Sequence, residues 1–169
     1  MAAEADEVDR IVDAWGTQRP DLDFSPLEVL SRVDRLSRHL DRARRAAFRR
    51  SDLEPWEWDV LSALRRAGEP YQLSPKQLLA QTLVSSGTMT NRIDRLVGRR
   101  LVRREADPAD RRGILVTLTD DGRIRVDAAI TRLVDAEAAL LGALARSDRD
   151  RLAALLRKLS LGFDVGVHL

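Results

Sequence analysis

The sequence of 169 residues contains no cysteine. A disulfide framework, a thiolate nucleophile, an Fe–S cluster and a zinc ribbon are therefore excluded, as is redox sensing through thiols. The two histidines, His39 and His168, have no carboxylates grouped around them in a metal-binding spacing, so neither a metal nor another cofactor is predicted. Glycine-rich phosphate loops, nucleophile elbows and His-Glu-x-x-His motifs are also missing. The sequence thus favours a protein that is not an enzyme.

Long hydrophobic runs are missing as well, since no apolar stretch approaches the roughly 20 residues of a membrane-spanning helix. The acidic start, from Met1 to Glu7, lacks the basic and then apolar pattern of a secretion signal. With 44% hydrophobic and 33% charged residues, the chain has enough apolar content to fold around a core. We expect a single folded domain that is cytoplasmic and makes no membrane contact.

Lysine is scarce, because Lys76 and Lys158 are the only two and the other 27 basic residues are arginine. The formal net charge is only +2, but the charge is unevenly distributed. Residues 1–31 hold eight carboxylates against two arginines, whereas residues 32–50 hold eight arginines against two aspartates. Residues 92–112 are again rich in arginine. Solvated helix faces explain both basic stretches as well as a nucleic-acid partner does, so charge alone does not decide.

Hydrophobic periodicity predicts helices along most of the chain. The predicted helices cover residues 4–18, about 25–48, 55–67, 74–82, about 119–145 and 147 onwards. Ser25-Pro26-Leu27-Glu28 and Ser74-Pro75-Lys76-Gln77 both have the form of a capped helix start, with serine as the N-cap.

A further helix is predicted over residues 85–100, capped by Ser85 or Ser86. Its buried stripe would consist of Met89, Ile93, Leu96 and Val97. The residues on its other faces are small, polar or basic, namely Ser86, Thr88, Thr90, Asn91 and Arg95.

The period changes after Arg100, where residues 101–105 and 113–118 have the alternation of strands. The intervening residues carry the proline and aspartates of a turn. A β-hairpin is therefore predicted, with Arg111 and Arg112 at its tip.

Two helices followed by an arginine-tipped hairpin make a mainly α fold with a small β-hairpin wing, the plan of a winged helix-turn-helix. The second helix of such a pair enters the major groove of DNA, while basic wing residues reach phosphates or the minor groove. The alternative is an all-helical scaffold with an incidental hairpin. The candidate DNA-binding residues are Ser85, Ser86, Thr88, Thr90, Asn91, Arg95, Arg111 and Arg112.

The stretch from Thr90 to Arg104, followed by Asp110-Arg111-Arg112 and by Val116-Thr117-Leu118-Thr119-Asp120-Asp121-Gly122, resembles the MarR family of transcriptional regulators. The resemblance covers about residues 30–160 and implies a homodimer that binds a pseudopalindromic operator and is released by a small ligand. It implies one winged-helix domain over residues 1–169. Within it, residues 1–50 and 119–169 would form the dimerisation helices, 54–118 the DNA-binding lobe, about 85–100 the recognition helix and about 101–118 the wing.

The urate-responsive, PecS-like branch of this family is matched more closely. Its members carry an added N-terminal helix with a tryptophan, an aspartate in a Glu-Trp-Asp-Val-Leu context, and arginines in the recognition helix and at the start of the wing. This sequence has Trp15, Asp59, Arg92 and Arg104 in those places. The resemblance implies a repressor released by urate or a related purine. Trp15 and Arg92 would hold the planar anion, and Asp59, paired with Arg104, would act as the lever.

Each of these residues also has a simpler interpretation. Trp15 would pack in a helix stripe, Arg104 would hold a DNA phosphate, and Asp59 would pair with any nearby arginine. His39, flanked by arginines, is interpreted as a surface or dimer-interface residue. Two other functions stay open. One is the same fold responding to a different organic anion, such as a tricarboxylate, and the other is a helical interaction protein that binds no DNA. The salt dependence of binding distinguishes this second function from DNA binding. In a plot of log affinity against log salt concentration, DNA affinity falls with a slope of about −0.9 per phosphate contact.

Overall fold

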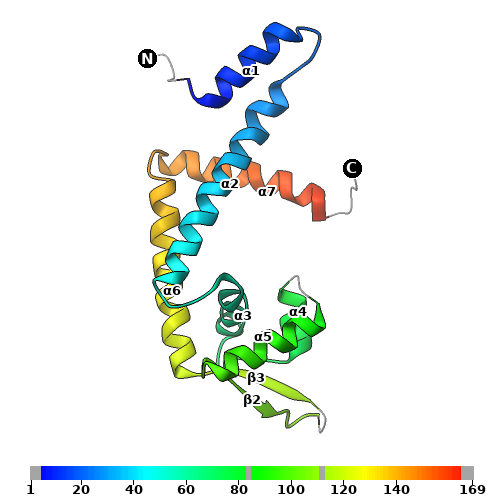
Figure 1. Cartoon of the computed structure of the whole chain (residues 1–169), viewed down its shortest axis with the longest axis vertical. Coiled ribbons are helices and arrows are strands. Elements are labelled where there is room, and N and C mark those ends of the chain that lie inside the picture. The colour runs from blue at the N-terminus through cyan, green and yellow to red at the C-terminus, as the bar shows by residue number, and fades with distance from the viewer. Residues whose placement is uncertain (1–4, 83–84, 111–112, 165–169) are drawn as a thin grey trace.

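A computed structural model of the chain describes residues 5–82, 85–110 and 113–164 (Figure 1). In chain order the elements are α1 (Glu7–Gln18), α2 (Ser25–Arg49), α3 (Pro55–Arg66), β1 (Gln72–Leu73), α4 (Pro75–Gln81), α5 (Ser86–Gly98), β2 (Val102–Ala106), β3 (Ile114–Leu118), α6 (Asp120–Leu140) and α7 (Arg146–Asp164). This order of helix pair, hairpin and long terminal helices confirms the predicted mainly α fold with a wing.

The molecule is elongated, with two parts that lie at opposite ends of a pair of long helices. Helices α2 and α6 pack side by side along the long axis (Figure 1). Helices α3, α4 and α5 and the hairpin gather at one end, while α1 packs on the first half of α2 at the other end (Figure 1). Helix α2 has 25 residues and is about 37 Å long, so α1 and α3 lie at different ends of it.

The core lies in the lobe formed by α3, α4, α5 and the hairpin. The predicted inner stripe of α5 is confirmed for Met89, Ile93 and Leu96, which are fully buried, whereas Val97 is half-buried. The same core cluster contains buried residues of α3, α4, the hairpin and α6, among them Val60, Leu61, Leu64, Leu78, Leu101, Val102, Val116 and Val126. The recognition helix is therefore seated on a continuous apolar core.

The hairpin belongs to a sheet of three strands in the order β1-β3-β2, all antiparallel. Strands β2 and β3 confirm the predicted hairpin, but β1 was not predicted. A polar cluster joins all three strands at one point. The Thr117 hydroxyl donates to Glu105 Oε2 at 2.7 Å, and the Gln72 amide donates to both side chains. The pKa of Glu105 lies below its ordinary value because of this hydroxyl and, next, the Arg103 guanidinium. The carboxylate thus holds the base of the wing together in its ionised form.

Three helices begin with a serine or threonine as a side-chain N-cap, and the predicted caps of α4 and α5 are confirmed. The side chains of Ser74, Ser85 and Thr119 accept the backbone N–H groups of Gln77, Thr88 and Gly122, respectively. Each cap satisfies a backbone donor that the helix leaves unpaired.

The prediction of Ser25 as an N-cap was wrong. Helix α2 begins at Ser25 itself, its N-cap is Phe24, and that position provides no side-chain cap. The Ser25 hydroxyl donates to Asp23 at 2.9 Å, and the Ser25 backbone N–H donates to the same carboxylate. Ser25 thus lies one residue after the N-cap position, and its polar groups are used in a local turn with Asp23 instead of a cap.

Gly122 in the first turn of α6 lies directly against the chain between α5 and β2. A Cβ atom built at Gly122 would sit 2.1 Å from the backbone oxygen of Leu101 and 2.9 Å from Leu118 Cδ1. The same oxygen accepts the backbone N–H of Thr119, and the Thr119 hydroxyl donates to the Arg100 carbonyl at 2.8 Å. The start of α6 is therefore fitted to the end of the recognition helix with no room for a side chain.

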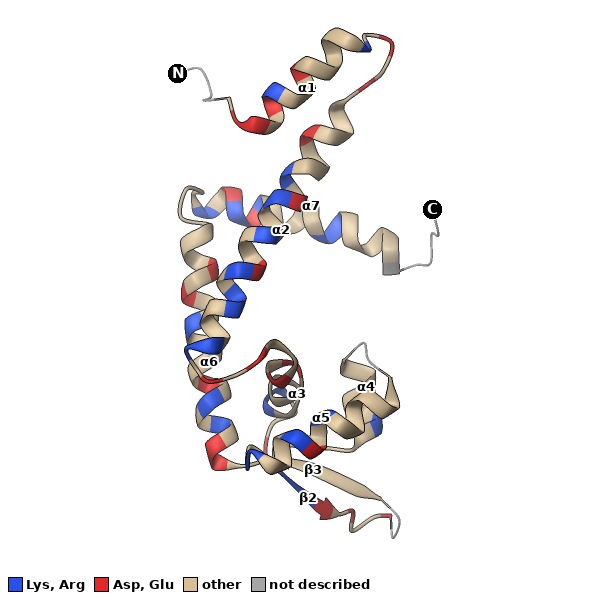
Figure 2. Ribbon diagram, in the orientation of Figure 1, with Lys and Arg blue, Asp and Glu red and all other residues tan. Residues whose placement is uncertain are grey.

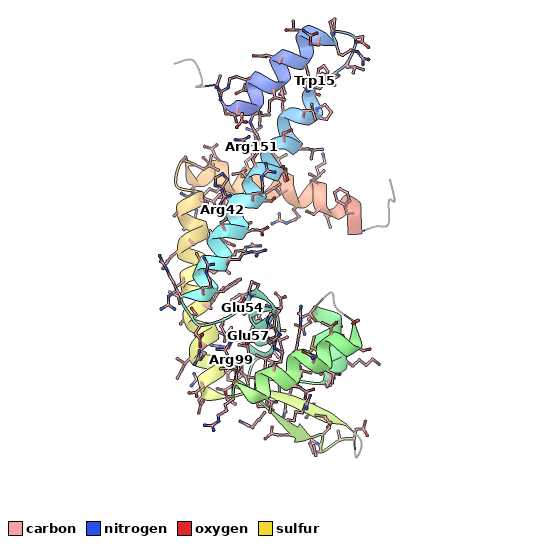
Figure 3. All side chains as sticks on the ribbon, in the orientation of Figure 1. Trp15, Arg42, Glu54, Glu57, Arg99 and Arg151 are labelled. Atoms are coloured by element: carbon pink, nitrogen blue, oxygen red, sulfur yellow. The ribbon has the colours of Figure 1, made fainter. Side chains whose placement is uncertain are left out.

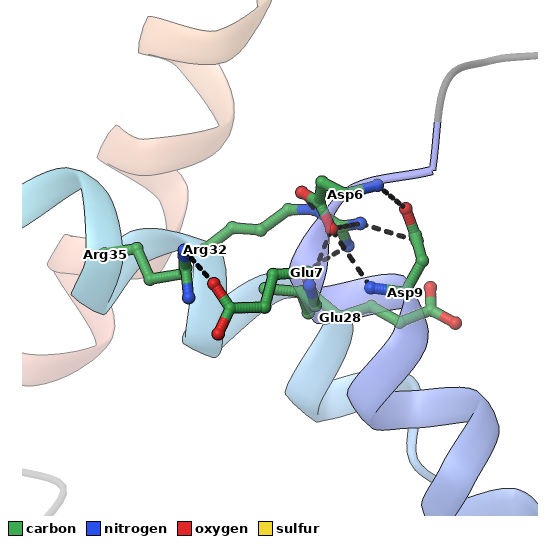
Figure 4. A network of polar contacts seen from close by, with 7 residues as sticks. Asp6, Glu7, Asp9, Glu28, Arg32 and Arg35 are labelled. Carbon is green, nitrogen blue, oxygen red and sulfur yellow. Dashed lines mark hydrogen bonds and ion pairs between the residues drawn. The ribbon is translucent and has the colours of Figure 1, made fainter.

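Helix α1 is attached to α2 largely through ion pairs (Figure 4). Arg32 binds Asp6 at 2.9 Å and Asp9 at 2.6 Å, and Arg35 binds Glu7. The pKa of Asp6 is lowered, first by the backbone N–H of Asp9 and then by Arg32, and the pKa of Glu7 is lowered by Arg35. The attachment is thus between groups that are ionised at neutral pH.

Large apolar side chains stay exposed on the helices outside the lobe. Leu36 on α2 is 60% exposed and Phe163 on α7 is 65% exposed. Others on these faces are Ile11, Trp15, Val29, Leu30, Val33, Ile130, Val134, Leu152, Leu155, Leu156, Leu159 and Leu161. Soluble monomers rarely leave so many apolar side chains uncovered. Among the described residues, no helix is both long enough and apolar enough to cross a membrane.

Candidate DNA-binding surface and effector pocket

The predicted recognition helix, α5, presents the expected polar residues on its outer face. Ser85, Ser86, Thr88, Thr90, Asn91 and Arg95 are all exposed. Three of the hydroxyls are already engaged, since those of Ser85 and Thr88 share a hydrogen bond of 2.9 Å and Thr90 donates to the Ser86 carbonyl at 3.2 Å. Arg111 and Arg112 lie outside the described residues. Asn91 and Arg95 therefore have the largest polar groups available on this surface.

Three arginines attach one side of α5, including its C-cap residue, to the start of α3. Arg92, Arg95 and Arg99 are spaced by three and four residues, so they lie on one side of the helix. Their partners are Asp59, Trp56 and Glu57, respectively. The orientation of the recognition helix is thus set by side chains from the first turn and a half of α3.

The strongest of these contacts is at the C-terminal end of α5. Glu57 is only 1% exposed, and its Oε2 accepts Arg99 Nη1 at 2.5 Å and the backbone N–H of Glu54 at 2.9 Å. Arg99 also donates to Asp52, to the carboxylate at 2.7 Å and to the backbone oxygen at 2.9 Å. A carboxylate buried to this extent requires a charged and hydrogen-bonded partner. Figure 3 shows Glu57 and Arg99 facing each other inside the lobe.

The same network reaches α6. Asp52 lies in the loop between α2 and α3 with a φ of 52°, in the left-handed region, and it binds Arg125 of α6 as well as Arg99. The pKa of Asp52 is lowered, first by the hydrogen bond from Arg125 and then by the charge of Arg99. The end of the recognition helix is thus connected to α6 through one ionised carboxylate.

The contact at the middle of α5 is much weaker. Arg92, the seventh of the 13 residues of α5, has its Nη1 3.7 Å from Asp59 Oδ2, which is beyond hydrogen-bond distance. The Arg92 side chain is only 18% exposed, and its Nη1 is buried without a hydrogen-bond partner among the described residues. Burial raises the pKa of Asp59, and the charge of Arg92 offsets this in part. The middle of the helix therefore holds a cation and a carboxylate that do not satisfy each other.

Two open hollows flank Arg92. One, of about 520 Å³, lies between α3 and the outer face of α5, and its lining consists of Trp56, Gly87, Thr88, Asn91, Arg92 and Arg95. The other, of about 540 Å³, lies on the opposite side, and its lining consists of Trp58, Asp59, Ser62, Arg66, Gln81, Thr82 and Arg92. Both hollows combine an indole ring with guanidinium groups, the pairing that suits a planar anion.

The structure brings together only two of the four predicted effector residues. Asp59 lies beside Arg92, so the predicted pairing of Asp59 with Arg104 was wrong. Arg104 binds Asp94 instead, at 2.6 Å. The reason is geometric, since β2 runs alongside α5 and places Arg104 next to the exposed Asp94 rather than near α3.

Trp15 does not reach this site within one chain. It is half exposed on α1, and its ring stacks on Phe24 with centroids 6.2 Å apart. Figure 3 shows Trp15 at the far end of the molecule from Glu57, which is two residues from Asp59 in α3. In the single chain, the indole rings near Arg92 are those of Trp56 and Trp58.

Basic and acidic residues are concentrated in different parts of the molecule. Basic residues follow α2 and gather where α5 passes into β2, whereas acidic residues are frequent on α1 and on the loop after it (Figure 2). The lobe that holds α5 carries both signs of charge, and its arginines are concentrated along α5 and the start of β2.

Comparison with known proteins gives the family. A model of the MarR family matches residues 51–113, which run from the end of α2 into the wing. The regulator PecS of Dickeya dadantii is 35% identical over 150 residues, covering 89% of this chain and 90% of PecS. The chain belongs to the MarR family of transcriptional regulators, in its PecS-like branch.

Solved structures of other MarR-family proteins share the fold. A variant of MarR from E. coli in complex with operator DNA has a TM-score of 0.66 and 27% identity, covering 80% of this chain and 96% of that one. BpsR of Bordetella bronchiseptica, whose DNA binding is regulated by 6-hydroxynicotinic acid, has a TM-score of 0.58 and 33% identity, covering 76% and 98%. This MarR-family protein is thus a DNA-binding transcriptional regulator, in agreement with the prediction of a function that is not enzymatic.

Several residues that position the site of this MarR-family protein were not singled out by the sequence. Asp52 lies in no motif, and Glu57 was considered only as the neighbour of Asp59, since glutamate is among the residues least often buried. Trp56 packs on the core, and its contact with Arg95 was not predicted. The repeat of arginines at positions 92, 95 and 99 on one helix side is the one signal that would have pointed to a shared partner helix.

Proposed function

We propose that this MarR-family regulator is a homodimeric repressor that urate, or a related planar purine anion, releases from its operator. The observation that carries the proposal is the state of Arg92. It is a mostly buried guanidinium on the recognition helix, with one nitrogen lacking a hydrogen-bond partner among the described residues and a carboxylate held 3.7 Å away. A planar anion would supply the acceptor that Arg92 lacks.

The homodimer is supported by the apolar faces of α1, α2, α6 and α7. These helices lie outside the lobe, and their exposed leucines, isoleucines and valines form stripes that only another chain would cover. A second copy fits best, since most soluble oligomers are symmetric dimers.

We expect the protein to behave as a dimer at all measurable concentrations and to protect two half-sites about 10 bp apart, or a multiple of that spacing. Light scattering and footprinting on the operator would show this. A stable monomer that binds a single half-site would contradict the dimer.

The effector site that we propose is the pair of hollows around Arg92. Arg92 would bind the anion, and the approaching negative charge would repel Asp59 from the start of α3. Trp15 belongs to this site only if it comes from the second copy, since α1 lies at the far end of its own chain. Arg104 would act indirectly, by holding Asp94 of the same recognition helix. The planar heterocyclic acid that regulates BpsR is a ligand of the same chemical class.

We expect urate to raise the melting temperature of the free protein while it lowers operator affinity, because both sites share one coupling free energy. Arg92→Ala should reduce both effects. Asp59→Asn should bind urate at least as well but release DNA less, since the charge that the anion repels is gone. Affinity for the anion should also rise as pH falls toward the raised pKa of Asp59, because a protonated Asp59 no longer repels the ligand.

The control for this experiment is Arg104→Ala, which removes a guanidinium without touching Arg92. It should leave urate stabilisation largely intact. If urate and other purine anions change neither the melting temperature nor operator binding, the urate proposal is wrong. A tricarboxylate tested on the same variants would then show whether the same arginines hold a different anion.

A further inference from the structure

We propose that Trp56 on α3 is a specificity-determining residue of the DNA-binding surface. Its indole ring would hold the guanidinium of Arg95 in one orientation, so that the donors of Arg95 meet the edge of a base. The inference rests on the proposed use of α5 for operator readout. It adds a positioning role for a residue that lies outside the recognition helix.

The geometry singles out one arginine. The Cζ atom of Arg95 lies 4.5 Å from the centre of the Trp56 ring, well within the range of a cation–π contact, whereas that of Arg92 lies 6.0 Å away, at its limit. Arg95 is exposed and lines the hollow that also contains Thr88 and Asn91. The stacked guanidinium thus lies in the same hollow as Asn91, whose side-chain amide is available on this surface.

The donors of Arg95 are also free. Across the part of the chain that the structure describes, Arg95 has no hydrogen bond or ion pair. Three other arginines nearby are occupied, since Arg99 binds Glu57, Arg103 binds Glu105 and Arg104 binds Asp94. The stacking on Trp56 uses the face of the guanidinium and leaves its N–H groups in the plane available. A guanine presents two acceptors in the major groove that match such a planar fork.

The ring is itself held in place. Trp56 is the second residue of α3 and packs on the buried core of the lobe. The next residue, Glu57, is fixed by its buried contact with Arg99. An unsupported arginine would lose much rotational freedom on binding a base, and a side chain already stacked loses less. The contribution of Trp56 should therefore appear as discrimination between DNA sequences.

The experiment compares variants on two duplexes at one salt concentration. The first duplex is the operator, selected from a random library by the unaltered protein, and the second is a scrambled sequence. Arg95→Ala should reduce the ratio of the two affinities by about 10- to 100-fold. Trp56→Leu should reduce the ratio by about 5- to 10-fold, while Trp56→Phe, which keeps an aromatic face, should retain most of it.

The decisive variant combines Trp56→Leu with Arg95→Ala. If Trp56 acts through Arg95, the double variant should have the same ratio as Arg95→Ala alone. The matched control is Tyr71→Leu, because the Tyr71 ring carries the guanidinium of Arg65, whose Cζ lies 5.0 Å from the ring centre, and not that of Arg95. That control should leave the ratio unchanged. Melting temperatures confirm that each variant is folded.

Two results would overturn the inference. Equal losses on operator and scrambled DNA for Trp56→Leu, or a further loss of the ratio in the double variant, would mean that Trp56 only supports the fold. An unchanged ratio for Arg95→Ala, with a shallower salt dependence, would show a phosphate contact. That last result would remove the basis of the inference. It would not affect the proposed repressor function or its effector, because these are tested with urate and not by the ratio of affinities.

Discussion

Arg99→Ala is expected to lower the free energy of unfolding by about 3 kcal/mol. The substitution leaves the Glu57 carboxylate buried without the cation that lies 2.5 Å from it, and removing one partner of a buried ion pair costs about 3–5 kcal/mol. The lower end of this range is expected because Arg99 is itself one-third exposed, so water reaches the gap. Denaturant unfolding at a fixed protein concentration would measure the loss.

Two further variants distinguish the effect of an unpaired buried charge on stability from the effect of losing a side chain. Lys76→Ala removes an exposed cation from α4 and should change the free energy of unfolding by less than about 0.5 kcal/mol. The double variant Glu57→Leu with Arg99→Leu should be more stable than Arg99→Ala, because no uncompensated charge remains. If Arg99→Ala is no more destabilising than Lys76→Ala, the network does not hold the recognition helix.

Gly122→Ala is expected to destabilise the protein by about 3 kcal/mol, at the upper end for an overpacked site. The new methyl group would meet the backbone oxygen of Leu101 at 2.1 Å, and backbone moves less readily than a side chain. Moving Leu101 away would also break its hydrogen bond with Thr119, which caps α6. The melting temperature and the denaturation midpoint would both report the change.

The matched control is another helical glycine with open space around it. A Cβ atom added at Gly16 in α1 would meet no heavy atom within 4 Å beyond its own helix backbone, so Gly16→Ala should stabilise the helix by up to about 1 kcal/mol. Opposite signs for the two substitutions would confirm that close packing, and not helix propensity, requires Gly122. A neutral Gly122→Ala would contradict this.

Local signals in the sequence were enough to predict the recognition helix and its wing. The helix was readable because the Ser85 cap, the stripe of Met89, Ile93 and Leu96, and the change of period after Arg100 agree with one another. The strand β1 was missed because it has only two residues, too few for an alternating pattern. Its place in the sheet depends on β3, which lies more than 40 residues further along the chain.

The candidate site was harder to predict because ion pairs depend on which helix faces which. The sequence placed Asp59 and Arg92 in the right elements, but the choice of Arg104 as the partner of Asp59 required knowing that β2 runs beside Asp94. The position of Trp15 is of a different kind, since in the proposed dimer its surroundings would depend on a second chain. No pattern within a single sequence contains that information.

The contacts of α5 are firm at its C-cap, Arg99, and loose at its middle, where Arg92 lies, so the helix can act as a lever that turns about Arg99. The helix has 13 residues and is about 20 Å long, so a rotation of about 10° around its fixed C-terminal end moves its first turn by about 3 Å. A displacement of that size exceeds the tolerance of a hydrogen bond to a base edge. Under the proposed mechanism, a small molecule that shifts Arg92 by about half that distance would withdraw the first turn of the helix from the groove.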